Sequence, residues 1–84
     1  MFRYHRNFQS RFTKTPEGVK TKLPLCLQTL ITEPHHPILN HHKLTGAFES
    51  WHSIDIHGDH RLIFQYLGGQ IILHDIGTHT QLYR

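Results

Sequence analysis

The sequence has little of what usually stabilises small secreted proteins or anchors a chain in a membrane. Its 84 residues include one cysteine, Cys26, so no disulfide can form within the chain. No run of about 18 apolar residues is present that would span a membrane, and residues 1–6 lack the apolar segment of a signal peptide. We therefore expect a cytoplasmic protein with no membrane partner, folded as one domain over residues 1–84.

Acidic side chains are also scarce at the start of the chain. Residues 1–22 contain six Lys or Arg against Glu17, a local charge of 6 − 1 = +5, whereas the whole chain carries +3. Nine of the ten histidines lie between His35 and His79, and each adds partial positive charge near neutral pH. This pattern favours an anionic partner, such as RNA or an acidic protein, although a solvated helix face has the same composition.

The first aromatic residues predict a strand followed by a helix. Tyr4, Phe8 and Phe12 recur every four residues, which is typical of one buried helix side and predicts a helix over about residues 6–14. Residues 1–5 alternate between aromatic and basic side chains, and we expect them to form a short edge strand before that helix.

A second helix is expected from the segment Thr15-Pro16-Glu17, which offers a capping hydroxyl, a first-turn proline and an acid near the positive helix end. Apolar residues keep helical spacing to about Thr32. Pro24 should bend this helix or delay its start, because it removes one backbone hydrogen bond. The prolines of residues 33–37 should end it, and a loop is expected over residues 40–46.

The apolar period changes to two at Trp51, which predicts strands over residues 51–57, 61–67 and 70–76. Gly58-Asp59 and Gly68-Gly69 supply the turns between them. We expect an α+β fold with two N-terminal helices packed on one face of a twisted, mostly antiparallel sheet of about four strands. Ser53, Asp55 and His57 should then lie on the opposite, open face.

Four segments of the second half form a specific set in a fixed order: His42-Lys43-Leu44-Thr45-Gly46, Trp51, Gly58-Asp59-His60-Arg61-Leu62-Ile63-Phe64 and Ile76-Gly77-Thr78-His79-Thr80-Gln81-Leu82-Tyr83. Together they resemble the RelE superfamily of toxins, especially its YafQ-like branch. The resemblance covers residues 39–84 well and the N-terminal helices in pattern and length. It implies a RelE-like fold and a small endoribonuclease of a type II toxin-antitoxin module.

Such toxins cut mRNA in the ribosomal A site without a metal or other cofactor. The resemblance therefore implies three partners, namely mRNA, the ribosome and a cognate antitoxin that neutralises the toxin. Operator DNA would be bound only through the antitoxin.

Metal-free cleavage of RNA requires a proton acceptor for the ribose 2′-hydroxyl, a positive charge at the phosphate and a proton donor for the leaving 5′-oxygen. His79 suits either proton transfer, although it could simply order the C-terminal turn. Arg61 could hold the scissile phosphate, as a matching arginine does in RelE-type toxins, or could form a surface ion pair with Asp59 or Asp55.

The resemblance supplies the remaining candidates. His42 matches a histidine that YafQ-like enzymes use for proton transfer, and Asp59 matches their acidic residue in the turn before the next strand. Tyr83 matches a terminal aromatic residue that can stack on a base, although it could equally pack the C-terminal tail. We expect RNA to be bound in addition by Lys43, Arg11, Lys14 and Arg84.

Two positions depart from the pattern of the family. Asp55 stands where YafQ-like members usually have a catalytic histidine, and Asp75 replaces an arginine. An aspartate accepts a proton but does not balance the charge of a phosphate, so catalysis would depend more heavily on Arg61. The histidine-rich sequence offers His57 or His60 as substitutes for the missing catalytic groups.

Two other functions remain open at this stage. The departures favour a catalytically weak or inactive protein of the same fold, acting through antitoxin or DNA binding. The histidine pairs His35-His36 and His41-His42 suggest a metal-binding protein, but adjacent residues seldom converge on one ion and no recognised metal motif is present.

Overall fold

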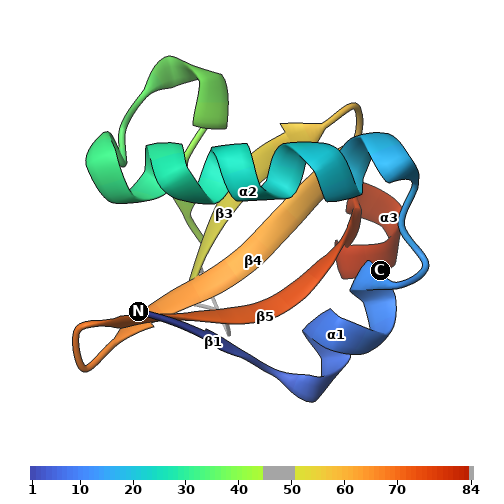
Figure 1. Ribbon diagram of the computed structural model, residues 1–84, viewed down its shortest axis with the longest axis horizontal. Helices are drawn as coiled ribbons and strands as arrows, with labels where there is room; N and C mark the ends of the chain where they lie inside the picture. The colour runs from blue at the N-terminus through green and yellow to red at the C-terminus, as the bar shows by residue number, and fades with distance from the viewer. Residues whose placement is uncertain (45–50, 84) are drawn as a thin grey trace.

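A five-stranded sheet forms the centre of the protein, and its faces are covered unequally (Figure 1). The computed structural model describes residues 1–44 and 51–83. Its elements are, in chain order, β1 (Phe2–Tyr4), α1 (Arg6–Phe12), α2 (Glu17–Thr32), the 3-10 turn η1 (Pro37–Leu39), β2 (His42–Lys43), β3 (Trp51–His57), β4 (His60–Leu67), β5 (Gln70–Thr78) and α3 (His79–Tyr83).

The strand order is β1-β5-β4-β3-β2. The antiparallel meander β3-β4-β5 confirms the prediction from the alternating pattern, and β1 pairs with β5 in parallel, at the edge of the sheet as expected. β2 pairs antiparallel with β3 inside the segment for which we predicted a loop. The sheet therefore has five strands instead of about four, because a strand of two residues is too short to show any alternation.

The turn between β4 and β5 follows directly from its sequence. Gly68 and Gly69 both have positive φ, at 57° and 78°. Two consecutive left-handed residues make the tight turn whose twist matches that of the flanking strands, and glycine adopts it without steric cost. The predicted hairpin is confirmed.

The helix α1 is shorter than predicted and ends at Phe12. It begins after His5, whose Nδ1 accepts a hydrogen bond of 3.1 Å from the backbone N–H of Asn7. Phe8 is buried and stacks on both Tyr4 and Phe12, with ring centroids 5.5 Å apart in each pair. Of the three rings in the sequence pattern, Phe8 is buried in the core as predicted and Phe12 is half-buried, whereas Tyr4, which belongs to β1, is 55% exposed.

The start of α2 corrects the capping expectation and removes one of the two alternatives for Pro24. Thr15 does not cap the helix, because its hydroxyl donates back to the carbonyl oxygen of Phe12 at 2.7 Å; Pro16 stands at the cap position without a side-chain hydrogen bond. Pro24 lies inside the helix without delaying it, since α2 begins at Glu17.

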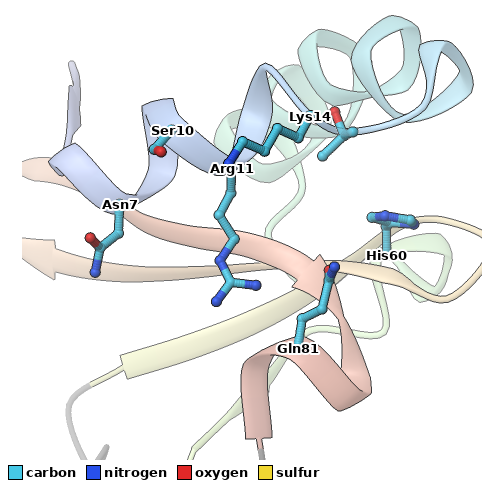
Figure 2. A pocket seen from close by; sticks show the side chains of 7 residues that line it. Asn7, Ser10, Arg11, Lys14, His60 and Gln81 are labelled. Carbon is cyan, nitrogen blue, oxygen red and sulfur yellow. The ribbon is translucent and has the colours of Figure 1, made fainter.

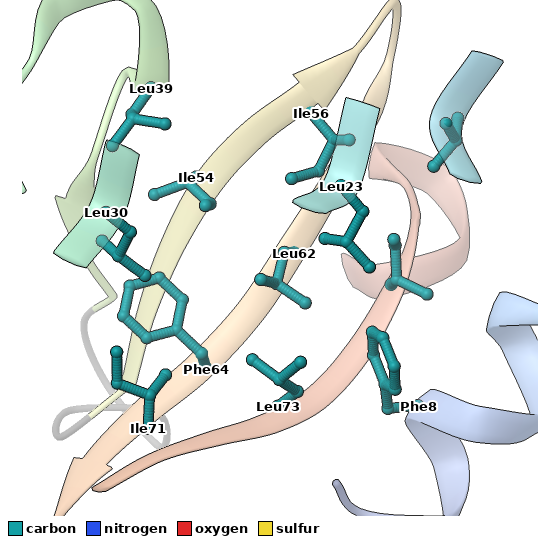
Figure 3. Close-up of a cluster of buried hydrophobic side chains, with 12 residues drawn as sticks. Phe8, Leu23, Leu30, Leu39, Ile54, Ile56, Leu62, Phe64, Ile71 and Leu73 are labelled. Carbon is teal, nitrogen blue, oxygen red and sulfur yellow. The ribbon is translucent and has the colours of Figure 1, made fainter. Parts of the chain in front are cut away.

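The core lies between α2 and the sheet. Figure 1 shows α2 crossing one face of β3 and β4, with α1 beside β5. In Figure 3, Leu23 and Leu30 project from α2 toward Leu62 and Phe64 of β4, all of them buried. Burial of such side chains stabilises the fold by about 1.5–3 kcal/mol each. In the part of the chain that the structure describes, no helix is long and apolar enough to cross a membrane.

Two irregularities in the sheet decide where functional side chains point. The register between β3 and β4 shifts between Asp55 and His57, and the register between β4 and β5 shifts between Ile63 and Phe64. Each shift inserts one extra residue into a strand, namely Ile56 in β3 and His74 in β5. Such a β-bulge interrupts the strict alternation of faces that the sequence analysis assumed.

Candidate active site

The sheet face opposite α2, called the open face below, has a row of three cross-strand neighbours at the end near the β3–β4 turn. Asp55 of β3 pairs with Arg61 of β4, and Arg61 pairs with Gly77 of β5. The Nε of Arg61 lies 3.4 Å from Oδ1 of Asp55, and Asn40 donates to Oδ2 of the same carboxylate at 3.3 Å. Both sequence hypotheses for Arg61 are thus compatible with its position, since the ion pair with Asp55 engages Nε and leaves the two terminal nitrogens to meet a ligand.

His42 belongs to the same face but lies at the far edge. It pairs with Ser53, whose neighbour on β4 is Ile63, which in turn pairs with Asp75 of β5. His42 and Asp75 are therefore three strand spacings apart, or about 14 Å. Lys43 pairs with His52 and so points to the other side of the sheet.

The hydroxyl of Ser53 is a feature that sequence reasoning did not single out. Ser53 is fully buried, and no hydrogen-bond partner for its Oγ lies within reach among residues 1–44 and 51–83. It has two polar neighbours on the same face: Asp55, two residues further along β3, and His42, its cross-strand neighbour on β2. A buried hydroxyl of this kind costs free energy unless another group binds it.

His57 does not lie on the open face, which corrects the prediction. The bulge at Ile56 turns His57 to the α2 side, where its ring lies 3.0 Å from the position that a Cβ on Gly18 would take. Asp59 is exposed in the two-residue turn between β3 and β4, where it was expected. His60, the first residue of β4, pairs with Thr78 at the end of β5.

His79 begins α3, and a reciprocal pair of hydrogen bonds fixes the start of this helix. Gln81 Oε1 accepts from the backbone N–H of Thr78 at 2.9 Å, and the backbone N–H of Gln81 donates to Oγ1 of Thr78 at 3.3 Å. This is a capping box, encoded by Thr78-His79-Thr80-Gln81. A Cβ on Gly77 would lie 3.2 Å from Cβ of Gln81, so α3 folds back closely over the open face.

His79 is exposed, and it follows two residues after Gly77, the cross-strand neighbour of Arg61. Tyr83 is the last residue of α3, and only its backbone is described; Arg84 lies outside the described residues, as do Thr45 and Gly46 of the first motif.

His74 is a second residue that the sequence analysis missed. As the extra residue of the β5 bulge it turns to the open face, where its ring stacks on Trp51 with centroids 4.2 Å apart and an angle of 11° between the planes. Its Nε2 lies 3.1 Å from Oε1 of Gln65. Burial, with a smaller contribution from the positive charge of His5, lowers the pKa of His74. The ring is therefore neutral at neutral pH, and only the bulge, which leaves no local signal, brings it to this face.

Asp75 is paired with an arginine from a distant element. The Nε of Arg11, on α1, lies 3.2 Å from Oδ1 of Asp75, which also accepts a hydrogen bond of 2.9 Å from the backbone N–H of Ile76. Burial raises the pKa of Asp75, while that hydrogen bond and the charges of Arg11 and His5 act in the opposite direction. Arg11 thus brings a guanidinium to the carboxylate of Asp75.

Two of the predicted RNA-binding residues share a hollow at this edge of the sheet. Arg11 lines it from α1 and Lys14 from the turn after this helix, and His60 and Gln81 line it from β4 and α3 (Figure 2). The hollow therefore adjoins the row of Asp55, Arg61 and Gly77 on the side of β5.

Of the four histidines considered as metal ligands, His35 and His41 gather on the α2 side of the sheet, whereas His42 belongs to the open face. His41 stacks on His35 and contacts His52, with ring centroids 5.4 and 5.1 Å apart. Among residues 1–44 and 51–83, however, no group of three His, Cys, Asp or Glu side chains is arranged to hold a metal ion.

No model of a known protein family matches the chain, and no curated protein matches it. Solved structures do match over nearly its whole length. The crystal structure of YafQ from E. coli has a TM-score of 0.83 and 17% sequence identity, with 100% of this chain and 98% of that chain covered.

Two toxin-antitoxin complexes are also similar. The E. coli DinJ-YafQ complex has a TM-score of 0.83 at 19% identity, covering 100% of this chain and 98% of that one. The RelB-RelE complex of Methanococcus jannaschii has a TM-score of 0.77 at 15% identity, covering 96% and 94%. The chain therefore has the RelE-like fold that its sequence predicted, and the YafQ structures match it from end to end.

Proposed function

We propose that this protein is the toxin of a type II toxin-antitoxin module and an endoribonuclease that cleaves mRNA at the ribosome, with residues 1–84 as one catalytic domain. The observation that carries the proposal is the position of Arg61. Its guanidinium lies on the open face, oriented by Asp55, in the strand row over which α3 and His79 fold. A fork-shaped cation, and an exposed imidazole two residues after its cross-strand neighbour Gly77, are two of the groups that cleavage of an RNA phosphodiester uses.

The reaction would begin with attack of the ribose 2′-oxygen on phosphorus and end with breakage of the bond to the 5′-oxygen. Arg61 would balance the charge that develops on the phosphate through its terminal nitrogens, since Nε is held by Asp55. His79 would transfer a proton on the β5 side, and His42 would transfer the other from the opposite edge. An RNA strand lying across the open face would contact both.

The remaining candidates have supporting roles in this proposal. Tyr83 would stack on a base, and Asp59 and His60 would contact the strand near the β3–β4 turn. Arg84 would add charge for the RNA backbone. Lys43, also predicted to bind RNA, points to the other side of the sheet and would not contact a strand on the open face. We propose no cofactor, because imidazole, guanidinium and carboxylate groups suffice for acid-base cleavage of RNA.

The decisive experiment measures cleavage of a defined mRNA in a translation extract, with ribosomes present and removed. Arg61→Ala and His79→Ala should abolish the cleavage. The control is Lys22→Ala, which removes one positive charge, as Arg61→Ala does, but from an exposed position on α2; it should leave cleavage intact. Growth inhibition under tightly controlled expression should likewise be lost in Arg61→Ala and His79→Ala and retained in Lys22→Ala. Cleavage at the wild-type rate by both site variants would refute the assignment.

The antitoxin is expected to cover an apolar groove between α1 and α2. This groove has a volume of about 620 Å³ and is lined chiefly by Tyr4, Phe8, Phe12, Leu23 and Leu27. An amphipathic antitoxin segment would bury these side chains, and its acidic residues would meet the basic N-terminal region. Operator DNA would be reached only through the antitoxin, in the cytoplasm.

The alternative is a catalytically weak protein of the same fold that acts through its antitoxin. One observation favours it: Arg61 and Arg11 each form an ion pair with a carboxylate, Asp55 and Asp75 respectively. A phosphate would have to compete with both. Tight antitoxin binding together with no cleavage in the assay above would establish this alternative.

A further inference from the structure

The hollow between α1 and α3 is a polar cavity of about 510 Å³. Its charge and polarity come from Asn7 and Arg11 on α1, Lys14 in the turn after α1, His60 at the start of β4 and Gln81 on α3. Figure 2 shows Arg11 extending from α1 toward β5 and α3, with His60 and Gln81 across the cavity from Lys14. All these side chains present nitrogen or amide groups to the same space.

The charge of the cavity is positive. Arg11 and Lys14 are permanently charged at neutral pH, and none of the described side chains that line the cavity is acidic. The carboxylate of Asp75 is paired with the Nε of Arg11, which fixes the guanidinium and leaves its other nitrogens for a ligand. Asn7 and Gln81 add neutral amide groups.

The cavity is continuous with the open face through Gly77. A Cβ on Gly77 would lie 3.4 Å from Nη1 of Arg11, so the guanidinium of Arg11 passes directly beside this residue. Arg61 is the cross-strand neighbour of Gly77 on β4, about 5 Å away between Cα atoms. Arg11 and Arg61 therefore stand on the two sides of Gly77.

We propose that this cavity binds a phosphodiester group of the RNA backbone, next to the phosphate held by Arg61. The inference rests on the proposed function, because it takes the same RNA strand as ligand. Backbone phosphates are bound by arginine, lysine and side-chain amides together, which is the set present here. Arg11 and Lys14 form the subsite, and Asp75 positions Arg11.

The test is the affinity for a fluorescent single-stranded RNA of 12 nucleotides in which every ribose is 2′-O-methylated. This probe has no 2′-hydroxyl and is not cleaved, so binding is measured independently of catalysis. Lys14→Ala should weaken binding about fivefold at 0.1 M salt and lower the slope of log Kd against log salt by about 0.7. Lys22→Ala, an equal loss of charge on α2, should change neither value.

Arg11→Gln should weaken the same binding at least as much, and melting curves establish that the variant is folded. Equal affinities of the Lys14→Ala, Lys22→Ala and wild-type proteins would overturn the subsite, even if unmodified RNA is cleaved normally. If the affinities differ as predicted but the wild-type protein does not cleave RNA, the proposed nuclease activity is wrong and the proposed binding site is supported. If purified antitoxin, but not the RNA probe, loses affinity on Lys14→Ala, the cavity takes an acidic protein segment and the proposal is wrong.

Discussion

His41 and His52 are joined by a hydrogen bond of 3.0 Å between Nε2 of His41 and Nδ1 of His52. The Nδ1 of His41 lies 2.7 Å from the carbonyl oxygen of Pro34, which can only accept, so this nitrogen carries the proton. In the neutral ring Nε2 is then an acceptor, and His52 must donate from Nδ1. With both rings neutral, the contact thus requires one tautomer of each ring. Protonation of both rings would place two N–H groups against each other and break it.

This pair predicts a loss of stability in mild acid. Burial, followed by the positive charges of His41, Lys43 and His35, lowers the pKa of His52 below its ordinary value of 6.5. The unfolded chain therefore binds a proton more readily than the folded one, and stability falls as pH falls through 6.5. Urea unfolding at pH 7.5 and 5.5 should show this decrease.

His52→Phe should reduce that pH dependence, because phenylalanine retains the stacking on Phe64 and Tyr66 but does not titrate. His42→Gln, at an exposed position, is the matched control and should leave the pH dependence unchanged. His74, whose pKa is also lowered, should account for part of the remainder. An unaltered slope in His52→Phe would show that the pair does not sense pH.

A second prediction concerns the capping box of α3. Thr78→Ala removes the hydroxyl that accepts from the backbone N–H of Gln81, and should destabilise the helix start by about 1 kcal/mol. Hydrogen exchange in α3 should become faster and mRNA cleavage slower, because His79 is the first residue of this helix. Thr78→Ser keeps the acceptor and should restore both. If Thr78→Ala cleaves as well as Thr78→Ser, the position of α3 does not matter for catalysis.

The sequence predicted the fold of this protein better than its candidate site. The period of two located β3, β4 and β5, and Gly68-Gly69 located their hairpin, since each depends on neighbouring residues alone. The bulges at Ile56 and His74 have no such local signal. Because one inserted residue changes the face of those that follow, His57 was assigned to the wrong side and His74 was overlooked.

The charge at Asp75 illustrates a second limit. Sequence reasoning treated this residue as the loss of an arginine, but Arg11 lies more than sixty positions earlier and reaches it through the packing of α1 against β5. Such a replacement depends on tertiary structure and is invisible to a motif. The capping box, by contrast, was readable in Thr78-His79-Thr80-Gln81 and was not recognised.

A third prediction follows from the tight approach of α3 to the sheet. Gly77→Ala would place a Cβ 2.7 Å from Oε1 and 3.2 Å from Cβ of Gln81, so α3 itself must shift. We expect a loss of about 1–3 kcal/mol in the free energy of unfolding and a large loss of cleavage. Gly18→Ala is the contrast, because its Cβ would meet only the exposed ring of His57, and alanine favours the helix. Equal stability of the two variants would argue against the close packing of α3.

The last prediction separates the two effects of the carboxylate at position 75. Asp75→Asn keeps an oxygen that can accept from the N–H of Ile76, but removes the charge that holds Arg11. The uncleavable RNA should then bind more tightly, because the phosphate no longer competes with a carboxylate for Arg11, whereas Arg11→Gln should bind it more weakly. Cleavage should nevertheless slow, since an unpaired guanidinium is less well oriented.

Stability provides an independent check on the same variant. Burial raises the pKa of Asp75 above 3.8, so the folded state takes up a proton more readily than the unfolded state, and this group lowers stability as pH rises from about 4. Asp75→Asn should remove that contribution and leave the opposite contribution of His52 and His74, giving a steeper rise of stability as pH increases from about 4. Weaker RNA binding together with an unchanged pH profile would mean that Asp75 neither restrains Arg11 nor is held at a raised pKa.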